Sequence, residues 1–229
     1  MYCNPSRIQV IVPDVDDTLV EGSEDAKDRA WFTVFKEFPP QELEKVIQRA
    51  QQKIVGGKGN RKDIARHVLT HFRYVDGQSG LGAEIEKRCD AFDAEVQGAM
   101  QKIGVRPKVL EALDTLKDRF PLYINTAIPR AVLDRTLQTL SIGSFFKNIY
   151  GTPGTKVKNL ERIASNAQVK PDQILFVSDG AGDWKASKEF GCQFIGIVTH
   201  RNKWREKPVG ERPEILVDHF EEILPMLQV

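Results

Sequence analysis

The sequence predicts an α/β protein with a Rossmann-like parallel sheet flanked by helices and an inserted α-helical bundle cap domain. Three observations lead to this prediction. Residues 8–13 form a short apolar run with high strand propensity. Between residues 23 and 103 apolar side chains recur at helical spacing, and no strand pattern is visible. After Pro107 predicted helices and strands alternate, which is typical of parallel strands joined by right-handed crossovers.

The inserted domain is expected to contain four amphipathic helices. Each has an apolar stripe that steps by three and four residues, and the clearest stripe runs from Ile85 to Ile103. The breaks between helices are expected at Pro39–Pro40, at the glycine-rich residues 56–59 and at residues 77–82. Four helices of this kind can bury their stripes against one another as a small bundle.

The remaining elements follow in alternation. Predicted helices cover residues 108–117, 130–140, 157–167 and 184–190, and strands or strand-like stretches cover residues 121–125, 145–150, 174–177, 193–198 and 214–217. Gly191 is a candidate left-handed cap for the fourth helix. The first strand belongs with the later ones, so residues 1–21 and 105–229 are expected to form the Rossmann-like domain and residues 22–104 the helical domain.

Composition excludes several classes of function. The formal net charge of +1 provides no global field for nucleic acid or an anionic membrane. No apolar stretch approaches the ~20 residues that a membrane span requires. The N-terminus lacks the pattern of a secretory signal, and Cys3, Cys89 and Cys192 are scattered without motif spacing. A cytoplasmic protein, monomeric or homodimeric, is expected.

Acidic residues gather where two predicted strands end. Asp14 and Asp16 follow the first strand, and Asp179 and Asp183 follow the strand at residues 174–177. In an open α/β sheet, ligands bind at the carboxyl ends of the strands. Two like charges at ~4 Å cost about 4 kcal/mol at an effective dielectric constant of ~20. A hard cation such as Mg²⁺ would relieve this repulsion, so a magnesium site is predicted.

These residues resemble the motifs of the haloacid dehalogenase-like (HAD) hydrolases, specifically phosphatases with a helical cap between the first and second motifs, such as phosphoglycolate phosphatases. The first motif is Asp14–Leu19, and the second is an apolar strand that ends at Thr126. The third is Lys156 at a helix start, and the fourth is the pair Asp179 and Asp183. Four motifs in this order, spanning nearly the whole chain, are specific, although each would be weak alone.

The resemblance implies a two-step phosphoryl transfer. Asp14 would attack phosphorus and form an aspartyl-phosphate, while Asp16 would protonate the leaving oxygen and then activate water. Thr126 and Lys156 would compensate charge on the phosphoryl oxygens. The implied magnesium ligands are the carboxylate of Asp14, the main-chain carbonyl of Asp16 and the carboxylate of Asp179, with Asp183 binding through water or orienting Lys156.

The substrate contacts are expected to come from both domains. The residues proposed for them are Thr18, Gly57, Lys58, Arg61, Thr126, Ala127 and Lys156. The glycine-rich basic segment around Lys58 has two interpretations that the sequence leaves open. It is either a loop that closes on the substrate or a solvated turn in which Asn60 caps the next helix.

Two positions need separate comment. Position 17 is Asp where the family usually has Gly, which places an extra charge or a bulkier turn beside the site. Lys158 is an alternative to Lys156 as the third-motif lysine, although the start of the helix favours Lys156. The basic segment at residues 200–205 follows a late strand, and a surface loop is preferred over a position at the same sheet edge.

The leading functional prediction is a Mg²⁺-dependent phosphatase for a small phosphate ester of the phosphoglycolate or sugar-phosphate type. The alternatives are a phosphomutase of the same family, which would retain Asp14 and Asp16, and a non-catalytic phosphate-binding regulatory module. Dehalogenase activity is disfavoured, because those family members lack an acid at the position of Asp16.

Overall fold

The computed structural model describes residues 4–54, 60–74 and 80–229. The chain divides into two compact units. One, here called the sheet unit, comprises Met1–Gly22 and Ile103–Val229, and the other, the helical unit, comprises Ser23–Lys102. Among the helices of the described part, none combines the length and the apolar character needed to span a membrane.

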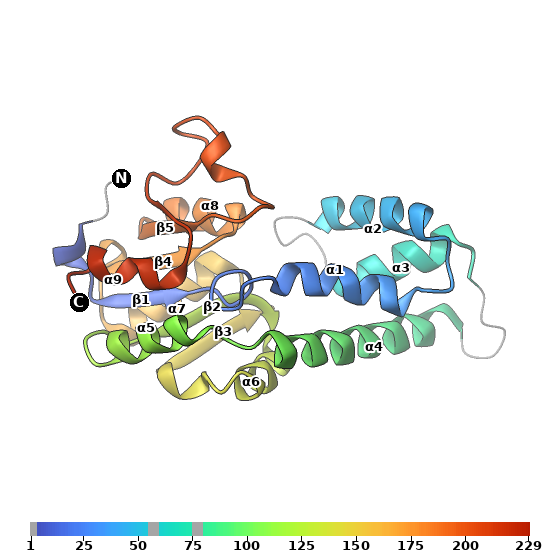
Figure 1. The fold of residues 1–229 in the computed structure, drawn as a ribbon, viewed down its shortest axis with the longest axis horizontal. Helices are drawn as coiled ribbons and strands as arrows, with labels where there is room; N and C mark the ends of the chain where they lie inside the picture. Colours follow the sequence, from blue (N-terminus) through green and yellow to red (C-terminus); the bar gives the residue numbers. More distant parts are fainter. Residues whose placement is uncertain (1–3, 55–59, 75–79) are drawn as a thin grey trace. The chain divides into compact units, whose positions relative to one another are not determined.

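The sheet unit is built on parallel strands, which confirms the predicted fold class (Figure 1). The strands are β1 (Val10–Pro13), β2 (Tyr123–Pro129), β3 (Asn148–Thr152), β4 (Ile174–Ser178), β5 (Gln193–Ile197) and β6 (Leu216–Val217). One group has the order β1-β4-β5-β6, and β2 pairs with β3. A parallel bridge between Ile11 and Leu122 places β2 next to β1. The strands therefore follow the order β3-β2-β1-β4-β5-β6.

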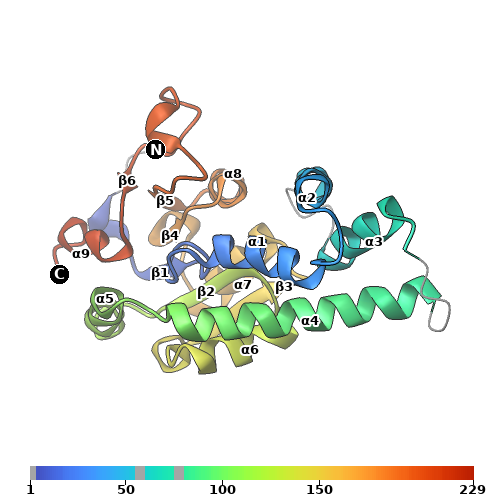
Figure 2. The same cartoon turned by 45° about the vertical axis from the view of Figure 1, so that its right-hand side comes forward.

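The helices of the sheet unit lie between successive strands. They are α5 (Pro107–Lys117), α6 (Arg130–Thr139), α7 (Lys156–Ala167), α8 (Ala181–Phe190) and the short α9 (Ile223–Met226). Since β3 lies at one edge, right-handed crossovers put α7 and α8, which pack together, on the face opposite α6 (Figures 1 and 2). The left-handed cap predicted at Gly191 is confirmed, with φ of 89°.

The central strands are covered on both faces, which explains their continuous apolar sequences. Every residue of β1 and β4 is buried. Val12 and Phe176 pack in one cluster with Leu160 and Ile163 of α7. This packing fixes the carboxyl ends of β1 and β4 side by side, in the register Pro13 to Val177. The residues that follow these two strands are therefore neighbours in space.

The helical unit contains the predicted helices, within the part of it that the structure describes. They are α1 (Ser23–Val34), α2 (Pro40–Ile54), α3 (Arg61–His71) and α4 (Gly80–Ile103). Trp31 of α1 stacks on Phe92 of α4, with ring centroids 4.0 Å apart. Asn60 caps α3 by accepting a hydrogen bond from the amide of Lys62 at 2.8 Å, while Asp63 accepts the amide of Asn60. The capping role considered for Asn60 is thus confirmed.

Several element boundaries differ from the prediction. Strand β2 continues to Pro129 instead of ending at residue 125, and β6 contains only Leu216 and Val217. The segment after β5 is not a simple surface loop, because the side chain of Trp204 is fully buried. Its ring lies edge-on to Phe194, with a centroid distance of 6.3 Å, and it also covers Gly196 in β5.

The close contact at Gly196 yields a stability prediction. A Cβ atom at this position would lie 2.6 Å from Cζ3 of Trp204 and 2.9 Å from side-chain carbons of Pro213 and Leu216. We expect Gly196→Ala to lower the free energy of unfolding by about 1–3 kcal/mol through overpacking, as measured by urea denaturation.

The matched control is Gly98→Ala in α4, where a Cβ atom would meet nothing within 4 Å. This substitution is expected to stabilise the protein by up to about 1 kcal/mol, because Ala has the higher helix propensity. Equal denaturation midpoints for Gly196→Ala and the wild type would contradict the packing argument.

Candidate active site

The first acidic residues are held by an extension of β1 and a tight turn. The amide of Asp14 donates to the carbonyl of Val177 at 2.9 Å, so pairing with β4 continues one residue past the strand. The carbonyl of Val15 then accepts the amides of Leu19 and Val20, at 3.0 and 3.1 Å. The turn keeps the side chains of Asp14 and Asp16 buried beside the end of β4, at 7% and 6% exposure.

The turn after β1 requires an uncommon backbone conformation at Asp17. Its φ is 45°, in the left-handed region that glycine adopts most readily and that Asp tolerates better than most other residues. Its amide donates to the carbonyl of Val20 at 3.1 Å. Asp17 thus accommodates a turn conformation that glycine adopts readily, and its side chain is buried at 3% exposure.

Lys156 joins three segments of the chain at the start of α7. Its Nζ lies 2.7 Å from Oδ2 of Asp183 and 3.3 Å from Oδ2 of Asp14. It also donates to the main-chain carbonyl of Asn125 at 2.9 Å. Burial alone would lower the pKa of Lys156, but the two carboxylates outweigh burial and raise this pKa above its ordinary value. The lysine is therefore held as a cation.

The surroundings of Asp14 disfavour the ionised form of its largely buried carboxylate. Burial is the largest influence and raises its pKa to about 6, and the nearby charge of Asp183 adds to this effect. Lys156 and a hydrogen bond from the Thr126 hydroxyl act in the opposite direction. The carboxylate is fixed in place, since its Oδ1 accepts the amide of Val15 at 2.8 Å. A further cation at this carboxylate would favour its ionised form.

Asp183 is engaged by groups of the fourth motif as well as by Lys156. The hydroxyl of Ser178 donates to Oδ2 of Asp183 at 2.6 Å, and the amide of Gly180 donates to the same hydroxyl at 3.0 Å. Of the two roles considered for Asp183, this arrangement favours orienting Lys156.

The threonines of the first and second motifs are buried in the same region. Thr126 lies on β2 at 1% exposure, and its hydroxyl accepts the amide of Ile128 at 3.3 Å. Thr18, also at 1% exposure, lies in the turn after β1. Ala127 is exposed on β2, next to Thr126. The sheet unit thus brings Asp14 and Thr126, which lie far apart in the sequence, to one edge.

The substrate contacts predicted from the helical unit are Arg61, Gly57 and Lys58. Arg61 forms an ion pair with Asp93 at 2.8 Å within that unit, so its guanidinium is already engaged. Gly57 and Lys58 lie outside the described residues. Their proposed contacts with the substrate stay predictions.

Two buried asparagines support Lys156, and the sequence analysis assigned them no role. Asn125 donates through Nδ2 to the main-chain carbonyl of Lys156 at 3.0 Å, and Asn159 donates to Oδ1 of Asn125 at 3.0 Å. Both asparagines are fully buried. A signal for Asn125 was present, because asparagine is depleted in strands and this one interrupts an apolar run.

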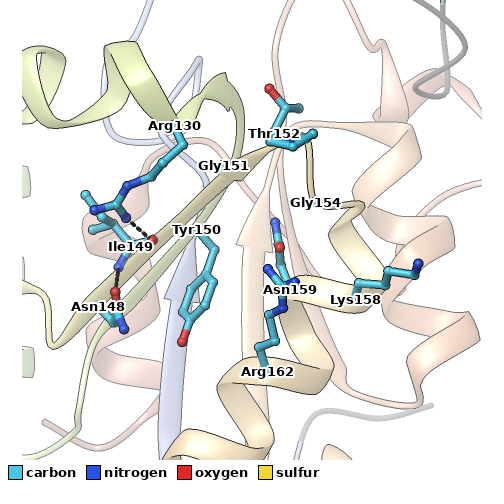
Figure 3. Close-up of a pocket in the computed structure, with 11 residues that line it drawn as sticks. Arg130, Asn148, Ile149, Tyr150, Gly151, Thr152, Gly154, Lys158, Asn159 and Arg162 are labelled. Atoms are coloured by element: carbon cyan, nitrogen blue, oxygen red, sulfur yellow. Dashed lines mark hydrogen bonds between the residues drawn. The ribbon is translucent and has the colours of Figure 1, made fainter.

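Lys158 faces a different part of the sheet unit. It lines a pocket of about 500 Å³ along β3, together with Arg130 and Arg162 (Figure 3). Its amide, at the first turn of α7, donates to the side chain of Thr155 at 3.3 Å. Lys156, in contrast, contacts Asp14 and Asp183 directly. The geometry therefore favours Lys156 as the lysine of the acidic site.

The residue types predicted for the metal site suit a magnesium ion with few protein ligands. In residues 4–54, 60–74 and 80–229, no three acidic, histidine or cysteine side chains are gathered as a metal cluster. The predicted set needs only two carboxylates, from Asp14 and Asp179, and one main-chain carbonyl, from Asp16. Mg²⁺ typically binds proteins in this way and keeps several of its waters. The raised pKa of Asp14 is consistent with a position that favours an added cation.

The basic segment at residues 200–205, after β5, reaches this edge of the sheet. From the sequence, a surface loop is the preferred interpretation. The side-chain amide of Asn202 donates to the main-chain carbonyl of Asp179 at 3.1 Å. The alternative position at the same sheet edge is therefore the one that the structure supports for Asn202.

Comparisons with known proteins agree with this fold and with the motifs on it. A phosphoglycolate phosphatase of Salmonella choleraesuis is 30% identical over 96% of this chain and 93% of its own length. The proposed HAD hydrolase YfnB of Bacillus subtilis, in a structure described as bound to magnesium, has a TM-score of 0.71 at 17% identity and covers 97% of this chain and all of its own. A proposed β-phosphoglucomutase of Thermotoga maritima has a TM-score of 0.72 at 18% identity, over 96% of this chain and 99% of its own.

The family assignment follows from sequence similarity, because the structural likenesses at such low identity establish the fold alone. The family model described as haloacid dehalogenase-like hydrolase matches residues 8–191, which include all four motifs. The resemblance recognised from the motifs is thus confirmed, and the chain belongs to the haloacid dehalogenase-like hydrolase family.

Proposed function

We propose that the protein is a Mg²⁺-dependent phosphatase that hydrolyses a small phosphorylated metabolite through an aspartyl-phosphate at Asp14. The observation that carries the proposal is the arrangement around Asp14. Its carboxylate is buried, lies 3.3 Å from Lys156 and accepts the hydroxyl hydrogen bond of Thr126. A fixed carboxylate flanked by a cation and a hydroxyl donor is suited to attack a phosphoryl group and to bind its oxygens.

The reaction proposed for these residues has two steps. In the first, an oxygen of Asp14 forms a bond to phosphorus as the ester bond breaks, and Asp16 donates a proton to the leaving oxygen. In the second, Asp16 takes a proton from water, the water oxygen attacks phosphorus, and Asp14 is released with inorganic phosphate. A bound Mg²⁺ would supply charge compensation at the phosphoryl oxygens. Lys156 and Thr126 supply the rest from the protein.

Phosphoglycolate or a similar small phosphate ester is the proposed substrate. The support for it is the phosphoglycolate phosphatase relative that aligns with 96% of this chain. Mutase activity would use the same Asp14 and Asp16, but would return the phosphoryl group to a second hydroxyl of the sugar. A non-catalytic phosphate-binding module would bind the anion without turnover.

The proposed chemistry is tested with p-nitrophenyl phosphate and phosphoglycolate, in Mg²⁺ and in EDTA. We expect hydrolysis only with Mg²⁺, and we expect Asp14→Asn to lose at least about a thousandfold in kcat, because the nucleophile is removed. Release of inorganic phosphate measures the rate, and thermal unfolding checks the fold of the variant. Residual activity of Asp14→Asn near the wild-type value would refute the covalent step, and absence of any turnover would favour a binding module.

The two lysines of α7 give a matched pair of variants. Lys156→Ala removes the cation beside Asp14 and is expected to lower kcat/KM at least about a hundredfold, as loss of a transition-state donor does. Lys158→Ala is expected to leave kcat/KM near the wild-type value, since Lys158 lines the separate pocket along β3. The reverse order of effects would show that Lys158 is the third-motif lysine.

The raised pKa of Asp14 predicts a pH-dependent stability difference in the metal-free protein. Because its folded-state pKa of about 6 exceeds the ordinary value of 3.8, the ionised carboxylate opposes folding above pH 6. This cost disappears as the pH falls through 6 towards 3.8. Asparagine never carries the cost, so Asp14→Asn should have a higher Tm than the wild type in EDTA at neutral pH, with the difference shrinking on acidification. A difference that stays constant with pH would contradict this assignment.

A further inference from the structure

The side chain of Asn202 connects the end of β5 to the acidic loop after β4. Its Nδ2 donates to the carbonyl of Ile197, the last residue of β5, at 2.9 Å. The same nitrogen donates to the carbonyl of Asp179 at 3.1 Å. Asp179 is the acid proposed above as a magnesium ligand. One side-chain amide therefore ties the backbone of that acid to the end of β5.

The side-chain oxygen of Asn202 is hydrogen-bonded as well as its nitrogen. Oδ1 of Asn202 accepts the main-chain amides of Thr199 at 3.2 Å and Trp204 at 3.1 Å. The main-chain amide of Asn202 donates to the hydroxyl of Thr199 at 3.2 Å. These contacts require two donors and an acceptor in one short side chain. An aspartate has acceptors alone and does not provide this combination.

Asn202 is also held on a rigid support. Trp204, two residues later, is fully buried against Phe194 and Gly196 of β5. Lys203 between them has φ of 49°, which completes the sharp turn. The side chain of Asn202 is thus supported by the packing of Trp204 on β5 as well as by its own hydrogen bonds.

The loop that Asn202 contacts needs such support. Asp179 is followed by Gly180, which precedes the first residue of α8, and glycine retains more backbone freedom than other residues. The hydroxyl of Ser178 fixes one side of the loop through the amide of Gly180 and the carboxylate of Asp183. Asn202 fixes the carbonyl of Asp179 itself.

We propose that Asn202 is a positioning residue that holds the Asp179 loop in the conformation that binds the divalent cation. This inference rests on the proposed function, since it takes Asp179 as a metal ligand. Groups that orient metal ligands commonly contribute about 10–100-fold to metal affinity. Loss of the Asn202 hydrogen bonds should therefore weaken the site without removing a ligand.

The test measures the affinity of the metal-free protein for Mn²⁺. Electron paramagnetic resonance determines the concentration of free ion at each step of the titration. We expect Asn202→Ala to weaken Mn²⁺ binding by about tenfold or more. Asn202→Ser provides a second variant, because its hydroxyl can still accept the amides of the turn but is too short to bridge to Asp179. It is expected to stay folded, as judged by thermal unfolding, and to show the same loss of affinity.

The matched control lies on the same segment. Arg205→Ala removes an exposed ion pair with Asp218, at 2.7 Å, and does not touch the acidic loop. It is expected to leave the Mn²⁺ affinity unchanged. Wild-type affinity in a folded Asn202→Ser variant would overturn the inference, as would an equal loss of affinity in Arg205→Ala.

Asp179→Asn separates this inference from the function on which it rests. If Asp179→Asn abolishes Mn²⁺ binding while Asn202→Ser binds normally, the positioning role fails and the proposed metal site stands. If Asp179→Asn binds Mn²⁺ as the wild type does, the proposed ligand set is wrong, and the role of Asn202 falls with it.

Discussion

The placement of the largely buried Lys156 between two carboxylates is the interaction on which the rest of the site depends. A buried ammonium group is tolerated only when opposite charges and hydrogen bonds compensate for the loss of water. Asp14, Asp183 and the carbonyl of Asn125 provide that compensation from three separate segments. The end of β1, the strand β2 and the start of α8 must therefore all reach α7, and the parallel sheet is the framework that brings them there.

The same cluster does not fully compensate the negative charge of Asp14. Lys156 is well compensated, yet burial still raises the pKa of Asp14 to about 6. A site that stabilised its carboxylates fully by itself would gain little from a cation or from a phosphoryl group. The unfavourable burial of Asp14 is thus consistent with a trade of stability for function, in which binding partners supply the remaining charge compensation.

Much of the fold and of the site was predictable, for reasons that differ between residues. Asp14 and Lys156 could be recognised because each stands at a fixed place relative to an apolar strand or a helix start. The partners of Asn125 and Asn202 could not be recognised, since both side chains donate to main-chain carbonyls of residues far away in the sequence. The buried Trp204 was likewise hidden, because a basic segment with one aromatic residue is indistinguishable from a solvated loop until its neighbours are known.

The sequence by itself determined the α/β class, the alternation of elements and the family, because apolar periodicity and motif order are local properties of the chain. It also indicated that Asp14 and Asp183 would lie close together, since parallel strands end at one edge of a sheet. Only the tertiary structure showed that Lys156 contacts Asp14 and Asp183 while Lys158 lines a separate pocket, and that Asn202 contacts the Asp179 backbone. These arrangements depend on side-chain direction and on contacts across many residues, which packing fixes and local sequence does not.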